Sequence, residues 1–326
     1  MTAKVYITRK LPDVIVEKLS KHFDIKMWEE EHSAVPRDVL LNEVKNVDGL
    51  LCLLTEKIDE ELLNEAKKLK VIGNLAVGYN NIDVKAANEK GIIVTNTPGV
   101  LTETTADLTF ALMMATARRV TEASDFLRNG EWGAWSPMQM TGQDVYGSTL
   151  GIIGLGRIGE ALVKRAKGFD MRVLYYNRTR KPEKEAELGI EYADFQSLLE
   201  QSDFVSLLIP YKPEVHHLIG KKELALMKKE AILINTARGG LVDESALYDA
   251  LANGLIWGAG LDVFEEEPVP VNHPLLTLPN LVTLPHIGSA TVKTRMKMAS
   301  LAADNILNVL QGKEPITPVN VVPATI

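Results

Sequence analysis

The sequence has one cysteine, no long apolar run and no excess of basic residues, and each shortage excludes a class of protein. Cys52, inside the apolar run GLLCLL, is the single cysteine among 326 residues, so an intrachain disulfide is excluded. No apolar run approaches the roughly 20 residues of a membrane span, and the first residues alternate like a strand rather than forming a signal peptide. The net charge of −7 disfavours a broad surface for nucleic-acid backbones. We expect a cytoplasmic protein that binds neither membranes nor nucleic acids and holds no metal.

Strand-like and helix-like segments alternate along the chain, which predicts α/β units with parallel sheets. In the first hundred residues we expect strands at 4–8, 48–54, 70–78 and 91–97. A long helix is expected over 103–130. Six more strands then follow, at residues 149–153, 171–176, 203–209, 231–237, 257–263 and 281–286. Six parallel strands are what a complete dinucleotide-binding fold contains. A last helix over 290–312 precedes a proline-rich, extended tail.

The stretch GLGRIG has the spacing of a dinucleotide-binding loop. An expected strand precedes it, a helix follows it, and a second strand ends about 20 residues further on, as this motif requires. The first glycine permits a tight turn, the second lets the backbone approach a pyrophosphate, and the third allows close packing of helix and strand. The cofactor site is therefore expected at Gly154, Leu155, Gly156, Arg157, Ile158 and Gly159.

The second strand of this unit ends in the basic stretch NRTRK, residues 177–181, where sites for NAD usually carry an acid that binds the ribose. A carboxylate there would repel a 2′-phosphate. Arg178 and Thr179 can instead bind one, with Asn177 beside them and Arg180 or Lys181 nearby. We predict NADP as the cofactor, with NAD as the weaker alternative. The other interpretation is a solvated basic turn.

Three side chains that can take part in catalysis lie at or after the ends of expected strands. Arg238 follows strand 231–237, Glu267 ends the acidic run EEE, and His286 ends the last strand. Each has an ordinary explanation when taken alone, such as a salt bridge, a solvated loop or a surface histidine. Ligands of open α/β folds bind at the carboxyl ends of strands, so together the three predict an anion clamp, a carboxylate and a proton-transferring imidazole. The residues alone do not choose between Glu265, Glu266 and Glu267.

The chain resembles the D-isomer-specific 2-hydroxyacid dehydrogenases over essentially its whole length. The motifs that carry the resemblance are GIIGLGRIG, NTARGGLVDESAL, AGLDVFEEEP, HPLLTLPNLVTLPHIGSAT and NLAVGYNNID. Within the family it is most similar to the glyoxylate/hydroxypyruvate reductase branch, with 2-ketogluconate reductase close by. The resemblance implies NAD(P)H-dependent reduction of a small 2-oxo acid to the D-2-hydroxy acid. It also implies two doubly wound parallel-sheet domains. A Rossmann domain (101–287) is inserted into a flavodoxin-like substrate domain (1–100 and 288–326).

The resemblance further implies particular site residues. Arg238, Glu267 and His286 are expected to be catalytic, since the position before Pro268 is the family match for the acid. The substrate is expected to contact Ala76, Val77, Gly78, Arg238 and Ser289, the first three through backbone N–H groups. Additional cofactor contacts are expected from Pro210, Thr236, Ala237, Asp262 and Thr105. Thr105 lies in the stretch TETTADL, where VAE is frequent in the family, and is placed on the nicotinamide side.

A tryptophan-containing loop bears on assembly. Trp132 and Trp135 lie in the segment NGEWGAWSPMQM and are either core residues or interface anchors. The resemblance implies a homodimer formed through this region, with Trp135 reaching the substrate pocket of the partner. Two other functions stay open: a phosphoglycerate dehydrogenase-type enzyme and a cofactor-sensing, corepressor-like binding protein.

Overall fold

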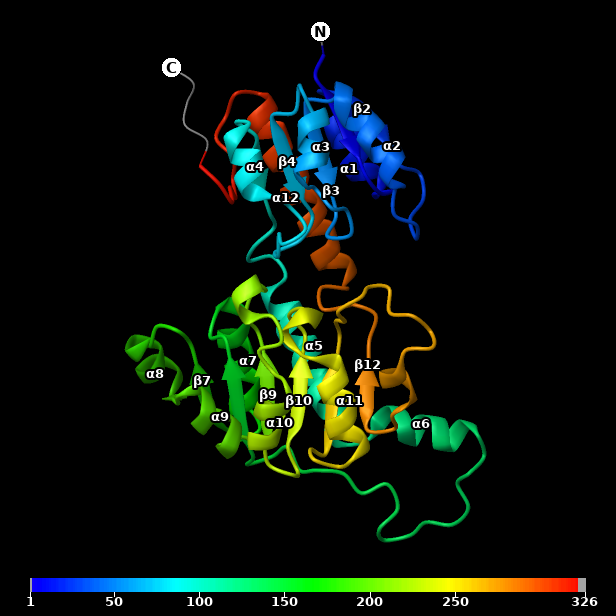
Figure 1. Cartoon of the computed structure of the whole chain (residues 1–326), viewed down its shortest axis with the longest axis vertical. Coiled ribbons are helices and arrows are strands. Elements are labelled where there is room, and N and C mark those ends of the chain that lie inside the picture. The colour runs from blue at the N-terminus through cyan, green and yellow to red at the C-terminus, as the bar shows by residue number, and fades with distance from the viewer. Residues whose placement is uncertain (1, 322–326) are drawn as a thin grey trace. The chain divides into compact units, whose positions relative to one another are not determined.

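The computed structural model describes residues 2–321, which divide into two units (Figure 1). Both ends of the described chain form one unit, up to Leu101 and from Thr291 onward, and Thr102–Ala290 forms the other. Each unit contains one wholly parallel sheet, which confirms the predicted fold class. Within the described residues, no helix combines the length and the apolar character that crossing a membrane requires.

The first unit has a five-stranded sheet in the order β2-β1-β3-β4-β5. This is the flavodoxin-like order. The strands are β1 (Lys4–Ile7), β2 (Asp24–Met27), β3 (Gly49–Cys52), β4 (Val71–Asn74) and β5 (Ile93–Thr95). β3 and β4 are buried at every residue because helices cover both faces of a parallel sheet. β2 was not predicted, because it is an edge strand whose sequence DIKM alternates between exposed and half-buried positions.

The helices of the first unit include one from the far end of the chain. They are α1 (Asp13–Ser20), α2 (Arg37–Glu43), the 3₁₀ turn η1 (Val44–Asn46), α3 (Glu60–Glu65), α4 (Val84–Glu89) and α12 (Val292–Leu310). α12 packs against β3 and β4, where a Cβ atom on Gly73 would lie 3.0 Å from Ile306 (Figure 1). The chain-terminal helix therefore completes the core around the first strands.

The second unit has a seven-stranded sheet in the order β12-β11-β10-β9-β6-β7-β8. From β6 the order runs outward in both directions, which is the Rossmann arrangement with one more strand beyond its sixth. The strands are β6 (Thr149–Ile153), β7 (Arg172–Tyr176), β8 (Glu191–Tyr192), β9 (Phe204–Leu207), β10 (Ile232–Asn235), β11 (Gly258–Leu261) and β12 (Leu281–Thr283). The prediction of six strands therefore missed one strand, β8. It is an edge strand of two residues, and its sequence has no hydrophobic pattern that would predict it.

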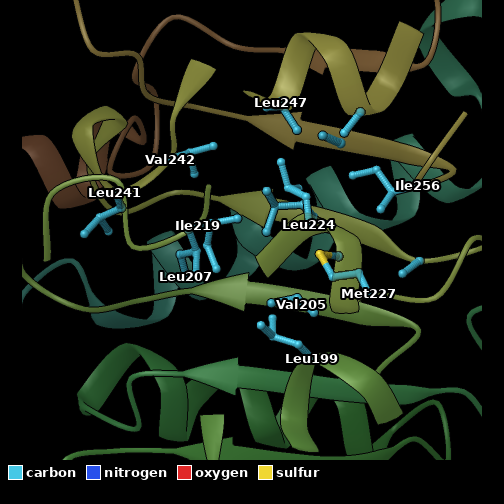
Figure 2. Close-up of a cluster of buried hydrophobic side chains, with 14 of the residues drawn as sticks. Leu199, Val205, Leu207, Ile219, Leu224, Met227, Leu241, Val242, Leu247 and Ile256 are labelled. Carbon is cyan, nitrogen blue, oxygen red and sulfur yellow. The ribbon is translucent and has the colours of Figure 1, made fainter. Parts of the chain in front are cut away.

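Helices and short 3₁₀ turns cover this sheet. They are α5 (Thr102–Ala117), α6 (Val120–Arg128), α7 (Arg157–Lys167), α8 (Pro182–Leu188), α9 (Phe195–Gln201), η2 (Pro213–Val215), α10 (Lys221–Leu226), η3 (Gly239–Leu241), α11 (Glu244–Ala252) and η4 (Pro274–Thr277). Figure 2 shows the core on one side of the sheet, where Leu207 of β9 belongs to the same buried cluster as Leu224 of α10 and Leu247 of α11. This packing fixes the carboxyl ends of the strands, where the candidate site lies.

The prediction of a single helix over 103–130 is wrong. The chain leaves helical geometry at Arg119, whose φ of 52° is left-handed, and α6 begins at Val120. The N–H of Gln143 donates to the carbonyl of Ala117, and a Cβ on Gly142 would overlap that same oxygen. The chain at 142–143 thus caps the end of α5, a tertiary contact that helical periodicity does not reveal.

Candidate active site

His286 and Glu267 form the central pair of the site. Nδ1 of His286 lies 2.7 Å from Oε2 of Glu267, in loops that follow β12 and β11. Burial raises the pKa of Glu267, but the hydrogen bond to His286 and the nearby charges outweigh it, so the net shift is below the ordinary value. The carboxylate is thus kept ionised beside the ring. Such a pair holds the ring through Nδ1 and leaves Nε2 as the ring nitrogen that faces away from Glu267.

A buried aspartate shapes the turn that carries His286. The backbone at His286 has a φ of 54°, a left-handed conformation that is uncommon for a residue other than glycine. The two carboxylate oxygens of Asp262 accept hydrogen bonds from the N–H groups of Ile287 and Gly288, at 2.7 and 2.8 Å. Burial raises the pKa of Asp262, while these N–H groups act against that shift. Asp262 therefore orders the His286 turn in addition to its expected contact with cofactor.

Arg238 begins the turn after β10, and this turn packs directly on the segment that carries Glu267. Burial lowers the pKa of Arg238, and the charge of Glu267 acts against that shift. An arginine guanidinium stays charged in proteins because its ordinary pKa is so high. Its Nη1 donates to the carbonyl of Ala237 at 2.6 Å. A Cβ on Gly239 would overlap the peptide group between Phe264 and Glu265. The Arg238 and Glu267 segments are thus in backbone contact because position 239 has no side chain.

Asn235 is a positioning residue that sequence reasoning missed. Its side chain is fully buried at the end of β10, donating to the carbonyl of Arg238 at 2.8 Å and accepting from the N–H of Ala237 at 3.0 Å. Both bonds fix the turn that presents Arg238. A buried asparagine immediately before TARGG was the available signal, since a buried amide needs partners and nearby turn backbone supplies them.

The glycine loop between β6 and α7 has the geometry that its sequence predicts. Gly154 has a φ of 108°, and a Cβ on Gly159 would lie 2.6 Å from the carbonyl of Gly154. Nothing lies within 4 Å of the position of a Cβ on Gly156. α7 begins at Arg157 with no side-chain cap, so its first N–H groups face outward as a helix N-terminus that suits a phosphate.

The basic stretch after β7 is largely engaged with protein groups. Arg180 donates to both oxygens of Glu185 at 2.8 and 2.7 Å. Hydrogen bonds from Arg180 and Tyr175 lower the pKa of Glu185 to about 2. Nζ of Lys181 donates to the carbonyl of Leu155 at 2.7 Å.

Two other residues of the stretch have exposed side chains. The side chains of Arg178 and Thr179 are exposed, and within residues 2–321 Arg178 forms no ion pair. Asn177 Oδ1 accepts from the N–H of Leu155 at 2.8 Å and so supports the glycine loop. Arg178 is therefore the cation of this stretch that is available to a ligand.

The other expected cofactor contacts of the second unit lie at strand ends or nearby. Thr105 of α5 is buried beside Gly288, since a Cβ on Gly288 would lie 3.5 Å from its methyl group. Oγ1 of Thr236 lies 2.7 Å from Oγ1 of Thr109. Pro210 and Ala237 follow β9 and β10, and Ser289 follows the His286 turn. Among the described residues, no three His, Cys, Asp or Glu side chains are grouped to hold a metal ion.

The expected substrate loop Ala76-Val77-Gly78 follows β4 in the first unit. Trp132 and Trp135 lie in the loop after α6 with side chains 55% and 76% exposed. They are therefore not core residues of the described chain, and the core interpretation of these tryptophans is wrong.

The chain is similar to known dehydrogenases. Residues 110–288 match the NAD binding domain of the D-isomer specific 2-hydroxyacid dehydrogenases. A glyoxylate reductase from Thermococcus litoralis is 53% identical over 324 residues, covering 98% of this chain and 97% of that one. A crystal structure of a protein from Thermus thermophilus is 46% identical with a TM-score of 0.91, covering 97% of this chain and all of that one.

A second solved structure adds a cofactor complex. The NADPH-dependent glyoxylate/hydroxypyruvate reductase from Sinorhizobium meliloti, in complex with NADP and malonate, is 34% identical with a TM-score of 0.85, covering 99% of this chain and 98% of that one. The chain therefore belongs to the D-isomer-specific 2-hydroxyacid dehydrogenase family, in its glyoxylate reductase branch.

Proposed function

We propose that this chain reduces small 2-oxo acids such as glyoxylate and hydroxypyruvate to D-2-hydroxy acids and prefers NADPH. The observation that carries the proposal is the 2.7 Å contact between His286 and Glu267 at the strand ends of a Rossmann unit. A charged arginine follows the neighbouring strand β10. Relatives named glyoxylate reductase support the substrate class.

The residues of the glycine loop fit a dinucleotide. The open space in front of Gly156 admits a pyrophosphate close to the backbone, and the N-terminus of α7 supplies N–H donors for it. Asp262, Thr236 and Thr105 would hold the nicotinamide side. When bound, the nicotinamide supplies the hydride that reduces C2 of the 2-oxo acid.

The protein's own groups perform the rest of the chemistry. Nε2 of His286, as imidazolium, donates a proton to the substrate oxygen as negative charge grows on it. The carboxylate of Glu267, whose pKa lies below its ordinary value, holds the ring through Nδ1. Arg238 binds the substrate carboxylate and carbonyl oxygen and orients both.

Steady-state assays test this proposal. We expect measurable kcat/KM for glyoxylate or hydroxypyruvate, with 2-ketogluconate and 3-phosphohydroxypyruvate as comparison substrates, each with NADPH and NADH. Highest efficiency with 3-phosphohydroxypyruvate would replace the proposal by a phosphoglycerate dehydrogenase-type enzyme. Tight cofactor binding without turnover of any 2-oxo acid would favour a cofactor-sensing binding protein.

Arg178 is expected to set the preference for NADPH. A charge-assisted hydrogen bond is worth roughly 1.5–3 kcal/mol, so Arg178→Ala should lower the NADPH to NADH ratio of kcat/KM by about ten- to a hundredfold. Arg180→Ala is the matched control, because Arg180 is already bound to Glu185. An equal loss with both cofactors in Arg178→Ala, or a wild type that favours NADH, would identify the stretch as a solvated turn.

We propose that the protein forms a homodimer through α6 and the loop after it (Figure 1). This segment exposes the apolar side chains Val120, Leu127, Trp132, Trp135 and Met138. Aromatic and methionine side chains are enriched at protein–protein interfaces. We expect sedimentation as a dimer at micromolar concentration, and Trp135→Ala should change the ratio of kcat/KM between glyoxylate and hydroxypyruvate. A monomer at that concentration contradicts the dimer, and a dimeric variant with an unchanged ratio removes Trp135 from the pocket.

A further inference from the structure

Three consecutive carbonyl groups of the substrate loop accept hydrogen bonds from the body of the first unit. The N–H of Thr97 donates to the carbonyl of Ala76 at 2.9 Å. Nδ2 of Asn96 donates to the carbonyl of Val77 at 2.8 Å, and Nδ2 of Asn74 to the carbonyl of Gly78 at 2.9 Å. The loop is therefore fixed through its oxygens by two side-chain amides and one backbone amide.

These bonds determine where the loop's N–H groups point. In a planar trans peptide the C=O and the N–H of the next residue point in opposite directions. Binding the carbonyls of Ala76, Val77 and Gly78 to the protein body therefore turns the N–H groups of Val77, Gly78 and Tyr79 away from it. Within residues 2–321 none of these three N–H groups has a protein acceptor. Successive N–H groups facing one side form a concave site that suits an anion.

Asn96 is itself held by a segment from the far end of the chain. Residues 313–321, red in Figure 1, follow α12 and pair with the edge of β5 through a bridge between Thr95 and Pro318. Oγ1 of Thr317 donates to the carbonyl of Asn96 at 2.6 Å, and the N–H of Asn96 donates to the carbonyl of Thr317 at 3.3 Å. Both backbone polar groups of Asn96 are thus bound to Thr317.

Asn305 of α12 fixes Thr317 in turn. Its side chain is fully buried, and Oδ1 accepts from the N–H groups of Ile316 and Thr317 at 2.8 and 3.0 Å. Its Nδ2 donates to Oγ1 of Thr317 at 2.8 Å. A continuous path of hydrogen bonds therefore runs from Asn305 through Thr317 and Asn96 to the carbonyl of Val77.

We propose that Asn74 and Asn96 are positioning residues that orient the loop N–H groups toward the substrate carboxylate, and that Thr317 and Asn305 hold Asn96 for this purpose. The inference rests on the proposed function, because it takes a 2-oxo acid as the anion. It assigns the segment after α12 a role in substrate affinity although this segment contains no residue expected to touch substrate.

Two variants test the inference, and Thr317→Ser is the matched control for one of them. Asn96→Ala and Thr317→Val should each raise the KM for glyoxylate, and the Kd of the unreactive analogue oxamate measured with cofactor present, by about tenfold, the value of one hydrogen bond. The kcat should change much less, since the carboxylate is bound in the ground state and the transition state alike. Thr317→Ser keeps the hydroxyl and should retain the wild-type KM.

Asn320→Ala is the control for stability alone. Asn320 lies in the same segment and binds the backbone of Ile92 and Val94, and among the described residues it forms no hydrogen bond with Asn96. It should lower the thermal midpoint and leave KM and the oxamate Kd unchanged. If Asn96→Ala and Thr317→Val behave like Asn320→Ala, the positioning role is wrong while the wild-type activity still supports the proposed function. A wild type that neither reduces glyoxylate nor binds oxamate overturns the proposed function, and this inference with it.

Discussion

Replacing His286 with alanine is expected to lower kcat by about 100- to 10,000-fold, the usual contribution of a general acid. The KM for NADPH should stay near the wild-type value, because within residues 2–321 no hydrogen bond or ion pair joins His286 to the glycine loop or to the basic stretch after β7. The measurements are steady-state kinetics with glyoxylate and a fluorescence titration of cofactor binding. Turnover within tenfold of wild type would remove His286 from its assigned role.

Glu267→Gln leaves the proton donor His286 in place and changes only the side chain that holds it. The pKa of Glu267 lies below its ordinary value, so the carboxylate is charged throughout the neutral range. The amide keeps a hydrogen-bonding group near Nδ1 but removes the counter-ion of the imidazolium. We expect kcat/KM for reduction at neutral pH to fall while the KM for NADPH stays near the wild-type value, because the residues expected to hold the cofactor are unchanged. A kcat/KM equal to that of the wild type would show that the charge of Glu267 is not needed.

Gly239→Ala is expected to damage the site nearly as severely without touching a reacting group. The added methyl would overlap the peptide group between Phe264 and Glu265, and backbone cannot move aside as a flexible side chain can. Either the Arg238 turn or the Glu267 segment must shift. Displacements of about 1 Å in an active site can cost roughly a hundredfold in rate, and overpacking commonly costs about 1–3 kcal/mol of stability.

Gly220→Ala is the comparison variant. A Cβ there would lie 3.5 Å from Oε2 of Glu223 and 3.8 Å from the carbonyl of His217, which are ordinary contact distances. It should leave kcat within about threefold of wild type. Activity in Gly239→Ala should be measured below its thermal midpoint, so that lost turnover is distinguished from unfolding. Wild-type kcat in folded Gly239→Ala would show that the two segments do not depend on each other.

The predictable parts of the fold are those whose local sequence pattern directly reflects their position in the folded unit. Fully buried central strands such as β4 and β10 read as apolar runs because helices cover both their faces. The GLGRIG spacing could be recognised because each of its positions requires glycine for a different steric reason. Gly154 has a positive φ, and a Cβ on Gly159 would lie too close to the carbonyl of Gly154.

Other features depend on contacts that no sequence window contains. The edge strands β2 and β8 bury little, so they carry no hydrophobic signal. The end of α5 at Ala117 is set by the chain at 142–143. The basic stretch after β7 suggested several phosphate ligands, but the pairing of Arg180 with Glu185 appears only in the folded unit.

The position of α12 has a consequence for the order in which the protein can fold during synthesis. By the time Ala290 leaves the ribosome, every strand and helix of Thr102–Ala290 has been made and can form its own core. The strands β1 to β5 are made far earlier, yet the surface of β3 and β4 that α12 covers stays open until residues 292–310 follow. The nascent chain thus carries an exposed apolar sheet face across nearly two hundred residues of elongation. Transiently exposed faces of this kind favour aggregation, so this half of the molecule is where chaperone assistance would have its effect.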